Sequence, residues 1–243
     1  MDLSKLANKN TNLKDLYEEV NQWKPVKAVR GQSIEWGSYA DNNTAYIEFS
    51  PDDKSPSALA HELLHFKVQK SGYKRLRGIA TNAKNKQGMK LLMEALDNEL
   101  QHHKMYKSFV EMGFSKQSFY SPNDVETKDY IGERLTSGSN ELIDLIPLYF
   151  TIVAPGGHLT ANERDGFKKQ IRVNYGSSSE FDLIDNELDK WVSSSSFNQE
   201  SIVKAIFSLV NGSLNTWIGY DDGTGFPTSG FFVGNPCSIS DFQ

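Results

Sequence analysis

A pair of histidines with a glutamate between them is the part of this chain best suited to chemistry. They lie in the segment Ala60-His61-Glu62-Leu63-Leu64-His65-Phe66. On an α-helix, residues four apart lie on one face about 6 Å apart along the axis, so both imidazoles can reach one metal ion. Neutral imidazole suits zinc, and two helical histidines with one further ligand leave a position open for water. Glu62 would stand beside the metal, where it can take a proton from the bound water and pass it to a leaving amine.

The segment from His61 to His65 resembles the H-E-x-x-H signature of the zincin metallopeptidases. As in that family, the positions inside and beside the motif are uncharged, namely Leu59, Ala60, Leu63, Leu64 and Phe66. Lys67 departs from the hydrophobic residue that is usual at its place. The resemblance covers about residues 33–110. It implies an α+β, zincin-like fold, a bound zinc ion and the hydrolysis of a peptide or protein substrate.

A second group of histidines lies in the segment Asn98-Glu99-Leu100-Gln101-His102-His103, which begins 33 residues after His65. Four of the chain's five histidines therefore fall in two short segments, as a metal site would require. Zincins with a glutamate as third ligand take it from a later helix, often from an Asn-Glu pair. The resemblance thus implies Glu99 as the third ligand, with His103 or His102 as the alternatives.

Side chains of this second segment that do not bind metal could act in catalysis. On a helix, Glu99 shares a face with His102, His103 and Tyr106, at i+3, i+4 and i+7. We assign His103 and Tyr106 to catalysis, as groups that hydrogen-bond a ligand or stabilise the developing oxyanion. The alternative for Tyr106 is a core aromatic. Two further acids of this region, Glu94 and Asp97, are interpreted as solvated charges.

Two other classes of protein could use the same residues. Glu62-x-x-His65 and Glu99-x-x-His102 are both Glu-x-x-His pairs, which occur on two helices of ferritin-like di-iron proteins. Such an oxidoreductase also needs a glutamate from each of two further helices. It leaves His61, and the strands expected before the motif, without a purpose. A non-catalytic metal-binding interaction protein would not need Glu62. The zinc-dependent peptidase is therefore preferred. Glutamates that could complete a di-iron site are Glu133, Glu141, Glu180 and Glu187.

The elements around the motif follow from apolar spacing and turn residues. Apolar positions at helical spacing predict a helix from about Leu3 to Trp23, and alternating residues predict strands at Ser33–Trp36 and Thr44–Phe49. With a turn at Asp41-Asn42-Asn43, these strands would form a small antiparallel sheet before the motif. The later strand would correspond to the substrate-aligning edge strand of zincins. The motif helix would start at Ser55 or Ser57 and stop near Gly72.

The rest of the chain is predicted to be mainly helical. A long helix is expected at about 88–112, ending at Gly113, and further helices at 123–135, 139–153, 160–174, 180–193 and 198–211. The last thirty residues suggest irregular structure or short strands. We expect a zincin-like metal-binding region over 1–115 and a helical region over 116–243, packed as one unit. Leu96-Asp97-Asn98-Glu99-Leu100 is nearly repeated as Ile184-Asp185-Asn186-Glu187-Leu188, which we interpret as two similar amphipathic helices and not as a duplication.

Composition limits the class of protein. The 243 residues carry a net charge of −5, so there is no basic footprint for nucleic acid. No apolar stretch is long enough for a membrane span, and the single cysteine, Cys237, excludes an internal disulfide. A cytoplasmic protein with no membrane or nucleic-acid partner is expected. His158 is expected to lie on the surface, in a loop. The sequence indicates neither the cleavage specificity nor the oligomeric state.

Overall fold

The chain forms two compact units that share one long helix. The computed structural model describes residues 1–31, 35–50, 53–120, 128–157, 159–211, 215–221 and 225–234, so the predictions for Cys237 and His158 fall outside the described residues. One unit consists of Met1–Gly72, Gln101–Val125 and Pro155–Gly157. The other consists of Tyr73–Leu100, Glu126–Ala154 and His158–Gln243. These boundaries differ from the expected division near residue 115, because helix α4 (Lys86–Glu111) belongs partly to each unit.

The first unit begins with two helices where one was predicted. They are α1 (Leu3–Ala7) and α2 (Thr11–Trp23). Asn10 interrupts the helix, since its backbone is extended and its side-chain oxygen accepts a hydrogen bond from Leu13 N at 3.0 Å. An asparagine in this position satisfies one of the free N–H groups of a helix start. The apolar face of α2 is buried and anchors it in the unit.

A three-stranded sheet lies between α2 and the motif helix in the sequence. It contains β1 (Val26–Arg30), β2 (Gly37–Ala40) and β3 (Ala45–Phe49), in the order β1-β3-β2. The two predicted strands pair antiparallel as expected, β2 with β3, but β1 was not predicted and runs parallel to β3, so the sheet is mixed. The strand that follows the Asp41 turn is central, not at the edge. The turn itself is confirmed, since Asp41 Oδ1 accepts from the backbone N–H groups of Asn43 and Thr44, each at 2.7 Å.

The strand expected at Ser33–Trp36 is displaced along the chain. Residues 32–34 lie outside the described part, Glu35 and Trp36 are not in a strand, and pairing starts at Gly37. Gly37 follows the predicted strand directly, and glycine is a residue type common in turns. Its pairing with Glu48 of β3 shows instead that the second strand begins there.

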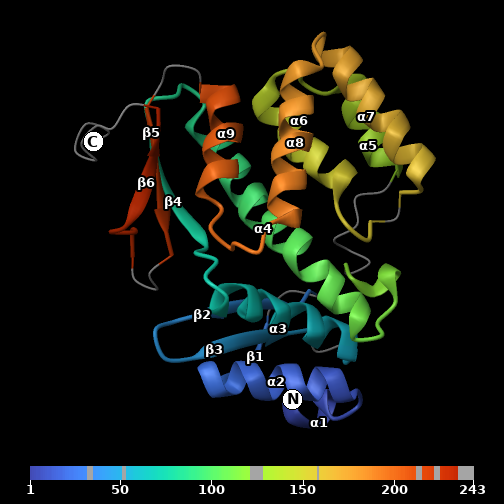
Figure 1. Ribbon diagram of the computed structural model, residues 1–243, viewed down its shortest axis with the longest axis vertical. Helices are drawn as coiled ribbons and strands as arrows, with labels where there is room; N and C mark the ends of the chain where they lie inside the picture. Colours follow the sequence, from blue (N-terminus) through green and yellow to red (C-terminus); the bar gives the residue numbers. More distant parts are fainter. Residues whose placement is uncertain are drawn as a thin grey trace. The chain divides into compact units, whose positions relative to one another are not determined.

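The helix that carries the motif is α3 (Pro56–Lys70). Ser55, one of the two expected caps, accepts a hydrogen bond from Ala58 N at 3.1 Å, and Pro56 opens the helix. The helix ends before Gly72, whose φ of +112° suits glycine. Helix α3 packs against α2 and also contacts β2. Figure 1 shows it running beside the first sheet.

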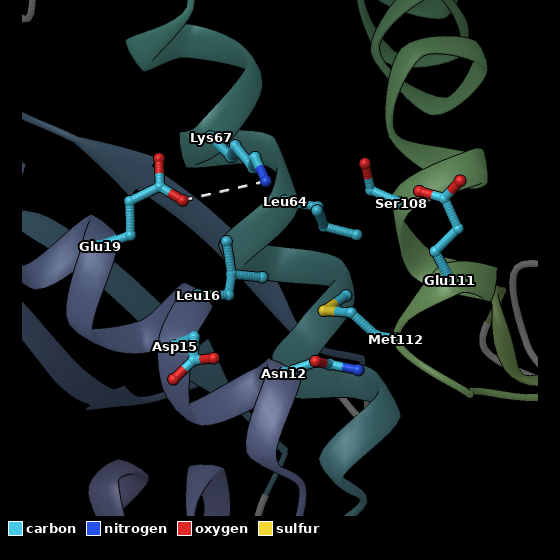
Figure 2. Close-up of a pocket in the computed structure, with 9 residues that line it drawn as sticks. All are labelled: Asn12, Asp15, Leu16, Glu19, Leu64, Lys67, Ser108, Glu111 and Met112. Atoms are coloured by element: carbon cyan, nitrogen blue, oxygen red, sulfur yellow. Dashed lines mark ion pairs between the residues drawn. The ribbon is translucent and has the colours of Figure 1, made fainter.

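A groove lies on the side of α3 that faces α2 and the end of α4. The groove has a volume of about 290 Å³. Figure 2 shows the residues that line it. The buried side chains of Leu16, Leu64 and Met112 form its apolar part. Lys67 lies at its edge and pairs with Glu19 at 3.8 Å. Its side chain is 43% exposed, so a lysine is tolerated at this position of the motif helix.

The second unit contains most of the remaining helices. They are α5 (Lys128–Ser137), α6 (Leu142–Val153), α7 (Ala161–Tyr175), α8 (Ser179–Ser193) and α9 (Glu200–Asn211). Each lies where helical spacing predicted one. Helix α7 packs against α5 and α6, and α8 packs against α9 (Figure 1). None of the helices in the described part of the chain combines the length and apolar character needed to cross a bilayer.

A second sheet joins distant parts of the chain within this unit. Its strands are β4 (Leu76–Thr81), β5 (Thr216–Tyr220) and β6 (Gly230–Val233), all antiparallel, in the order β4-β5-β6. Strands β5 and β6 confirm the expectation of short strands in the last thirty residues, whereas β4 was not predicted. The described chain therefore combines helices with two small sheets, and its C-terminal half is mainly helical.

Candidate metal centre

Three histidine side chains converge within the first unit. His61 and His65 come from α3 and His102 from α4. One ring nitrogen of each lies within 4.8 Å of the others, and the two Nε2 atoms of His61 and His65 are 3.3 Å apart. His65 and His102 are buried, with 8% and 3% of their surface exposed. This arrangement could hold a metal ion.

The i, i+4 spacing on α3 brings the first two rings together, as expected. A hydrogen bond from α4 then orients one of them, since the amide oxygen of Gln101 accepts from Nδ1–H of His65 at 3.1 Å. With its proton on Nδ1, His65 presents the Nε2 lone pair to His61. Two such nitrogen atoms at 3.3 Å repel each other unless a proton or a cation lies between them. Three imidazoles also suit zinc, so the donor set fits that ion.

The protonation state of His61 agrees with a role as ligand. Burial, together with the neighbouring His102, lowers the pKa of His61 to about 3, and a backbone hydrogen bond with Phe119 opposes the shift. His61 is therefore neutral at physiological pH. Only a neutral imidazole can bind a metal ion, because protonation occupies the lone pair.

Aromatic rings line the histidine group. Phe119 lies 4.9 Å from His61, and Tyr120 lies 5.0 Å from His102, measured between ring centroids. Both follow the short 3₁₀ helix Lys116–Ser118, whose start is capped by Ser115. Sequence analysis missed these two residues, because a Phe-Tyr pair after a short turn carries no periodic pattern. Phe119 is 1% exposed, so it excludes water from its side of the cluster.

Glu62 is buried beside the cluster. It follows His61 on α3 and is only 7% exposed. Consecutive residues of a helix point about 100° apart around its axis, so Glu62 is next to the face that carries His61 and His65 and not on it. The structure thus places Glu62 in a buried position one residue from His61 on the motif helix.

The expected third ligand, Glu99, is not part of the cluster. Among the described residues, the group with ligand atoms close enough for one metal ion consists of the three histidines, with His102 in the place assigned to Glu99. Glu99 is half-buried and its carboxylate lies 3.5 Å from the Asn98 amide. The structure thus brings together His61, His65 and His102, which was one of the two alternatives to Glu99.

The two residues assigned to catalysis have different surroundings. Tyr106 packs its ring against Phe119, with 5.1 Å between centroids, and so contacts the aromatic lining. Gly156, with φ of +73°, lies against the same ring, where a Cβ atom would be 2.5 Å from Tyr106 Cε2. Tyr106 itself is half-buried, and its assignment to catalysis stays a prediction. His103 is half-buried on α4 and is not in the metal-ligand group.

Asp97 corrects another expectation, because it is buried and not solvated. It is 4% exposed, and its carboxylate accepts from Leu76 N at 2.8 Å and from the Tyr73 hydroxyl at 3.0 Å. Arg75 pairs with it at 3.4 Å. Burial raises the pKa of Asp97, although these three partners act against the shift. Glu94 is exposed, as expected.

Comparisons with known proteins give no relative on which to base a function. No protein-family model, no curated protein and no solved structure matches this chain. The functional argument therefore depends on the site itself.

Proposed function

We propose that this protein is a zinc-dependent peptidase. In this proposal, His61, His65 and His102 hold the metal and Glu62 is the general base. The observation that carries it is the convergence of three imidazoles, two of them with Nε2 atoms 3.3 Å apart, beside a buried glutamate. A site that only stabilised the fold would not need that glutamate.

A bound zinc ion would supply Lewis-acid chemistry, lowering the pKa of a coordinated water and polarising the peptide carbonyl. Glu62 accepts a proton from the attacking water while the oxygen of that water bonds to the carbonyl carbon of the substrate. It then delivers that proton to the nitrogen of the scissile bond, which leaves as an amine when the carbon–nitrogen bond breaks. The buried surroundings of Glu62 strengthen its electrostatic interaction with charge that develops nearby.

The di-iron alternative has less support. It needs carboxylates as most of its ligands and gives His61 no role. In the described residues, the possible metal-binding group contains three histidines and includes His61. The histidine cluster therefore favours a single metal ion.

A zincin-like arrangement remains part of the proposal. Helix α3 follows a small sheet, and β2, at the edge of that sheet, contacts α3. In this proposal β2, and not the central β3, takes the place of the substrate-aligning strand. The substrate would be a peptide or protein. We propose that the protein itself is cytoplasmic, since its single cysteine excludes an internal disulfide.

Metal analysis combined with one substitution tests this function. We expect one zinc per chain, and a mixture of unstructured peptides should be cleaved by the zinc-loaded protein. Glu62→Gln should keep the zinc and lose at least about 100-fold in cleavage rate, the size typical of a general base. Glu94→Gln, which changes an exposed glutamate on α4, is the matched control. Equal cleavage by the parent and Glu62→Gln would exclude the general-base role, and two irons per chain would favour the oxidoreductase.

A further inference from the structure

Gln101 connects the two helices that supply the histidines. It is 1% exposed and lies on α4 directly before His102. Its side-chain oxygen is 3.1 Å from Nδ1 of His65 on α3. Helix α4 thus places one histidine in the cluster and orients another, through two consecutive residues.

This hydrogen bond selects one tautomer of His65. An amide oxygen can only accept, so the proton of the ring lies on Nδ1 and the lone pair on Nε2. Nε2 is the nitrogen that faces His61 at 3.3 Å. If the proton were on Nε2, His65 would present a donor to the cluster and could not bind a cation there. The Gln101 contact therefore prepares His65 as a ligand before any metal arrives.

The chemical type of the orienting group matters as well. A carboxylate on Nδ1–H would pull the proton toward itself and make Nε2 a stronger donor to a metal. The neutral amide of Gln101 fixes the ring without adding negative charge. A metal held by such ligands keeps more of its positive charge, which favours activation of water over tight binding.

We propose that Gln101 is a positioning residue that fixes the Nε2-ligating tautomer of His65, and that its neutral amide sets the metal affinity of the site below what a carboxylate would give. The second part rests on the proposed metal site, whereas the first concerns the protein without metal. The two parts can therefore fail separately.

The tautomer is tested first, on the metal-free protein. Long-range ¹H–¹⁵N NMR spectra distinguish protonated Nδ1 from protonated Nε2 in a neutral histidine. We expect His65 to be protonated on Nδ1 in the parent and to lose this preference in Gln101→Met, which keeps the length of the side chain without the oxygen. A parent protonated on Nε2 would overturn the proposal, whatever the protein does with metal.

Metal affinity is tested with zinc ions in competition with a chromogenic chelator, and with cobalt(II) as a spectroscopic probe. Gln101→Met should weaken zinc binding about 10- to 100-fold, the usual effect of removing such a partner, and should alter the visible cobalt spectrum. Gln101→Glu should bind zinc at least as tightly as the parent. The control is Gln69→Met on α3, because Gln69 Nε2 is buried and has no hydrogen-bond partner among the described residues. The zinc affinity of this variant should differ from the parent's by less than about twofold.

The outcomes separate orientation from packing. Equal zinc affinity in the parent and Gln101→Met would overturn the positioning role. Equal weakening in the Met and Glu variants would show that an acceptor oxygen at this position does not by itself support metal binding, and would also overturn the positioning role. If Gln101→Met is unfolded by circular dichroism, the near-isosteric Gln101→Glu decides alone, and a weaker affinity than the parent's contradicts the proposal. A parent with the expected tautomer but no zinc would leave the first part standing and refute both the second part and the proposed function.

Discussion

Glu99 and His102 differ in direction by about 60° around the axis of α4, since three residues of a helix turn about 300°. Sequence spacing therefore places both on nearly the same face. Which of them reaches His61 and His65 depends on how α4 is rotated relative to α3, and that rotation is set by tertiary packing. The histidine that lies in the cluster is buried, whereas the glutamate is half-buried.

His102→Ala should accordingly remove zinc from the protein, while Glu99→Ala should retain it. The reason is that, in the described part of the chain, the group whose ligand atoms lie within 4.8 Å of one another contains His102 and not Glu99. Zinc content after dialysis against micromolar free zinc measures the difference. A full equivalent of zinc in folded His102→Ala, together with loss in Glu99→Ala, would restore the original assignment.

Asp97 is a second residue whose role is set by its partners. Alanine at this position would leave the buried Leu76 N–H without its carboxylate acceptor, whereas the Tyr73 hydroxyl would keep the backbone carbonyl of residue 97, 3.0 Å away. We expect the free energy of unfolding to fall by about 2 kcal/mol, because an unsatisfied buried group costs about 1–3 kcal/mol. Denaturant titration measures this loss. Glu94→Ala, at an exposed site on the same helix, should change it by about 0.5 kcal/mol or less. Equal effects would mean that Asp97 does not anchor β4 to α4.

The two copies of the five-residue near-repeat, at 96–100 and 184–188, both lie on helices and make similar contacts through their aspartates. In α4, Asp97 accepts a hydrogen bond from the Tyr73 hydroxyl and pairs with Arg75. In α8, Asp185 accepts from the Tyr149 hydroxyl at 2.6 Å and pairs with an arginine, Arg172, at 2.8 Å. Flanking aliphatic residues are buried in both copies. Each copy is thus a helix turn that anchors a neighbouring element through a carboxylate, a tyrosine and an arginine.

Helix α7 shows a cap whose contribution depends on pH. Thr160 and Glu163 form a capping box, and the Lys128 ammonium, 2.8 Å away, is the main reason why the pKa of Glu163 falls from 4.5 to about 2. A carboxyl whose pKa is lower in the folded state than in the unfolded state stabilises the fold when the pH is above its ordinary pKa. That stabilisation disappears as the pH falls from about 4.5 to 2.

Glu163→Gln should therefore be less stable than the parent at pH 7 and equally stable near pH 2. Thermal unfolding of both proteins across this range, at low salt, measures the difference. Asp165→Asn, which changes an exposed carboxylate of the same helix, serves as the control and should show a smaller dependence on pH. A constant difference between Glu163→Gln and the parent would mean that the charge of Glu163 has no part in the effect.

Local sequence identified the helices and the two histidines of α3 because both depend on spacing along one segment. It misplaced β2 and missed β4, since whether a short segment forms a strand depends on partners elsewhere in the chain. Leu76–Thr81 has a glycine at its centre and pairs with residues 216–220. The burial of Asp97 was not predictable for the same reason, as its acceptor role is defined by Tyr73 and Leu76.

At the scale of the whole molecule, the three histidines of the candidate metal centre all belong to one of the two compact units. A ligand that binds only the folded state stabilises the part of the protein that holds it, by about 2.7 kcal/mol at a concentration 100 times its Kd. In the proposed metalloprotein, EDTA should therefore increase hydrogen exchange in α3 and in residues 101–111. Helices α6 to α9, which belong to the other unit, should change little.

Hydrogen exchange read out by mass spectrometry, with and without zinc, measures this contrast. His102→Ala, which should bind no zinc, is the control in which EDTA has no effect on either unit. Uniform changes throughout the parent would show that the two units open together and not separately.

The pairing of β4 with β5 also affects the order in which the chain can fold. About 135 residues separate Thr81 from Thr216, whose hydroxyls lie 2.7 Å apart in the finished sheet. During synthesis, β4 emerges long before the strand that covers it, whereas the first sheet forms from residues 26–49 alone. Closing so long a loop is slow, and an uncovered strand edge promotes aggregation. A ribosome-bound chain that ends before residue 216 should therefore hold a finished first sheet and an unpaired β4, the segment where a chaperone would be most needed.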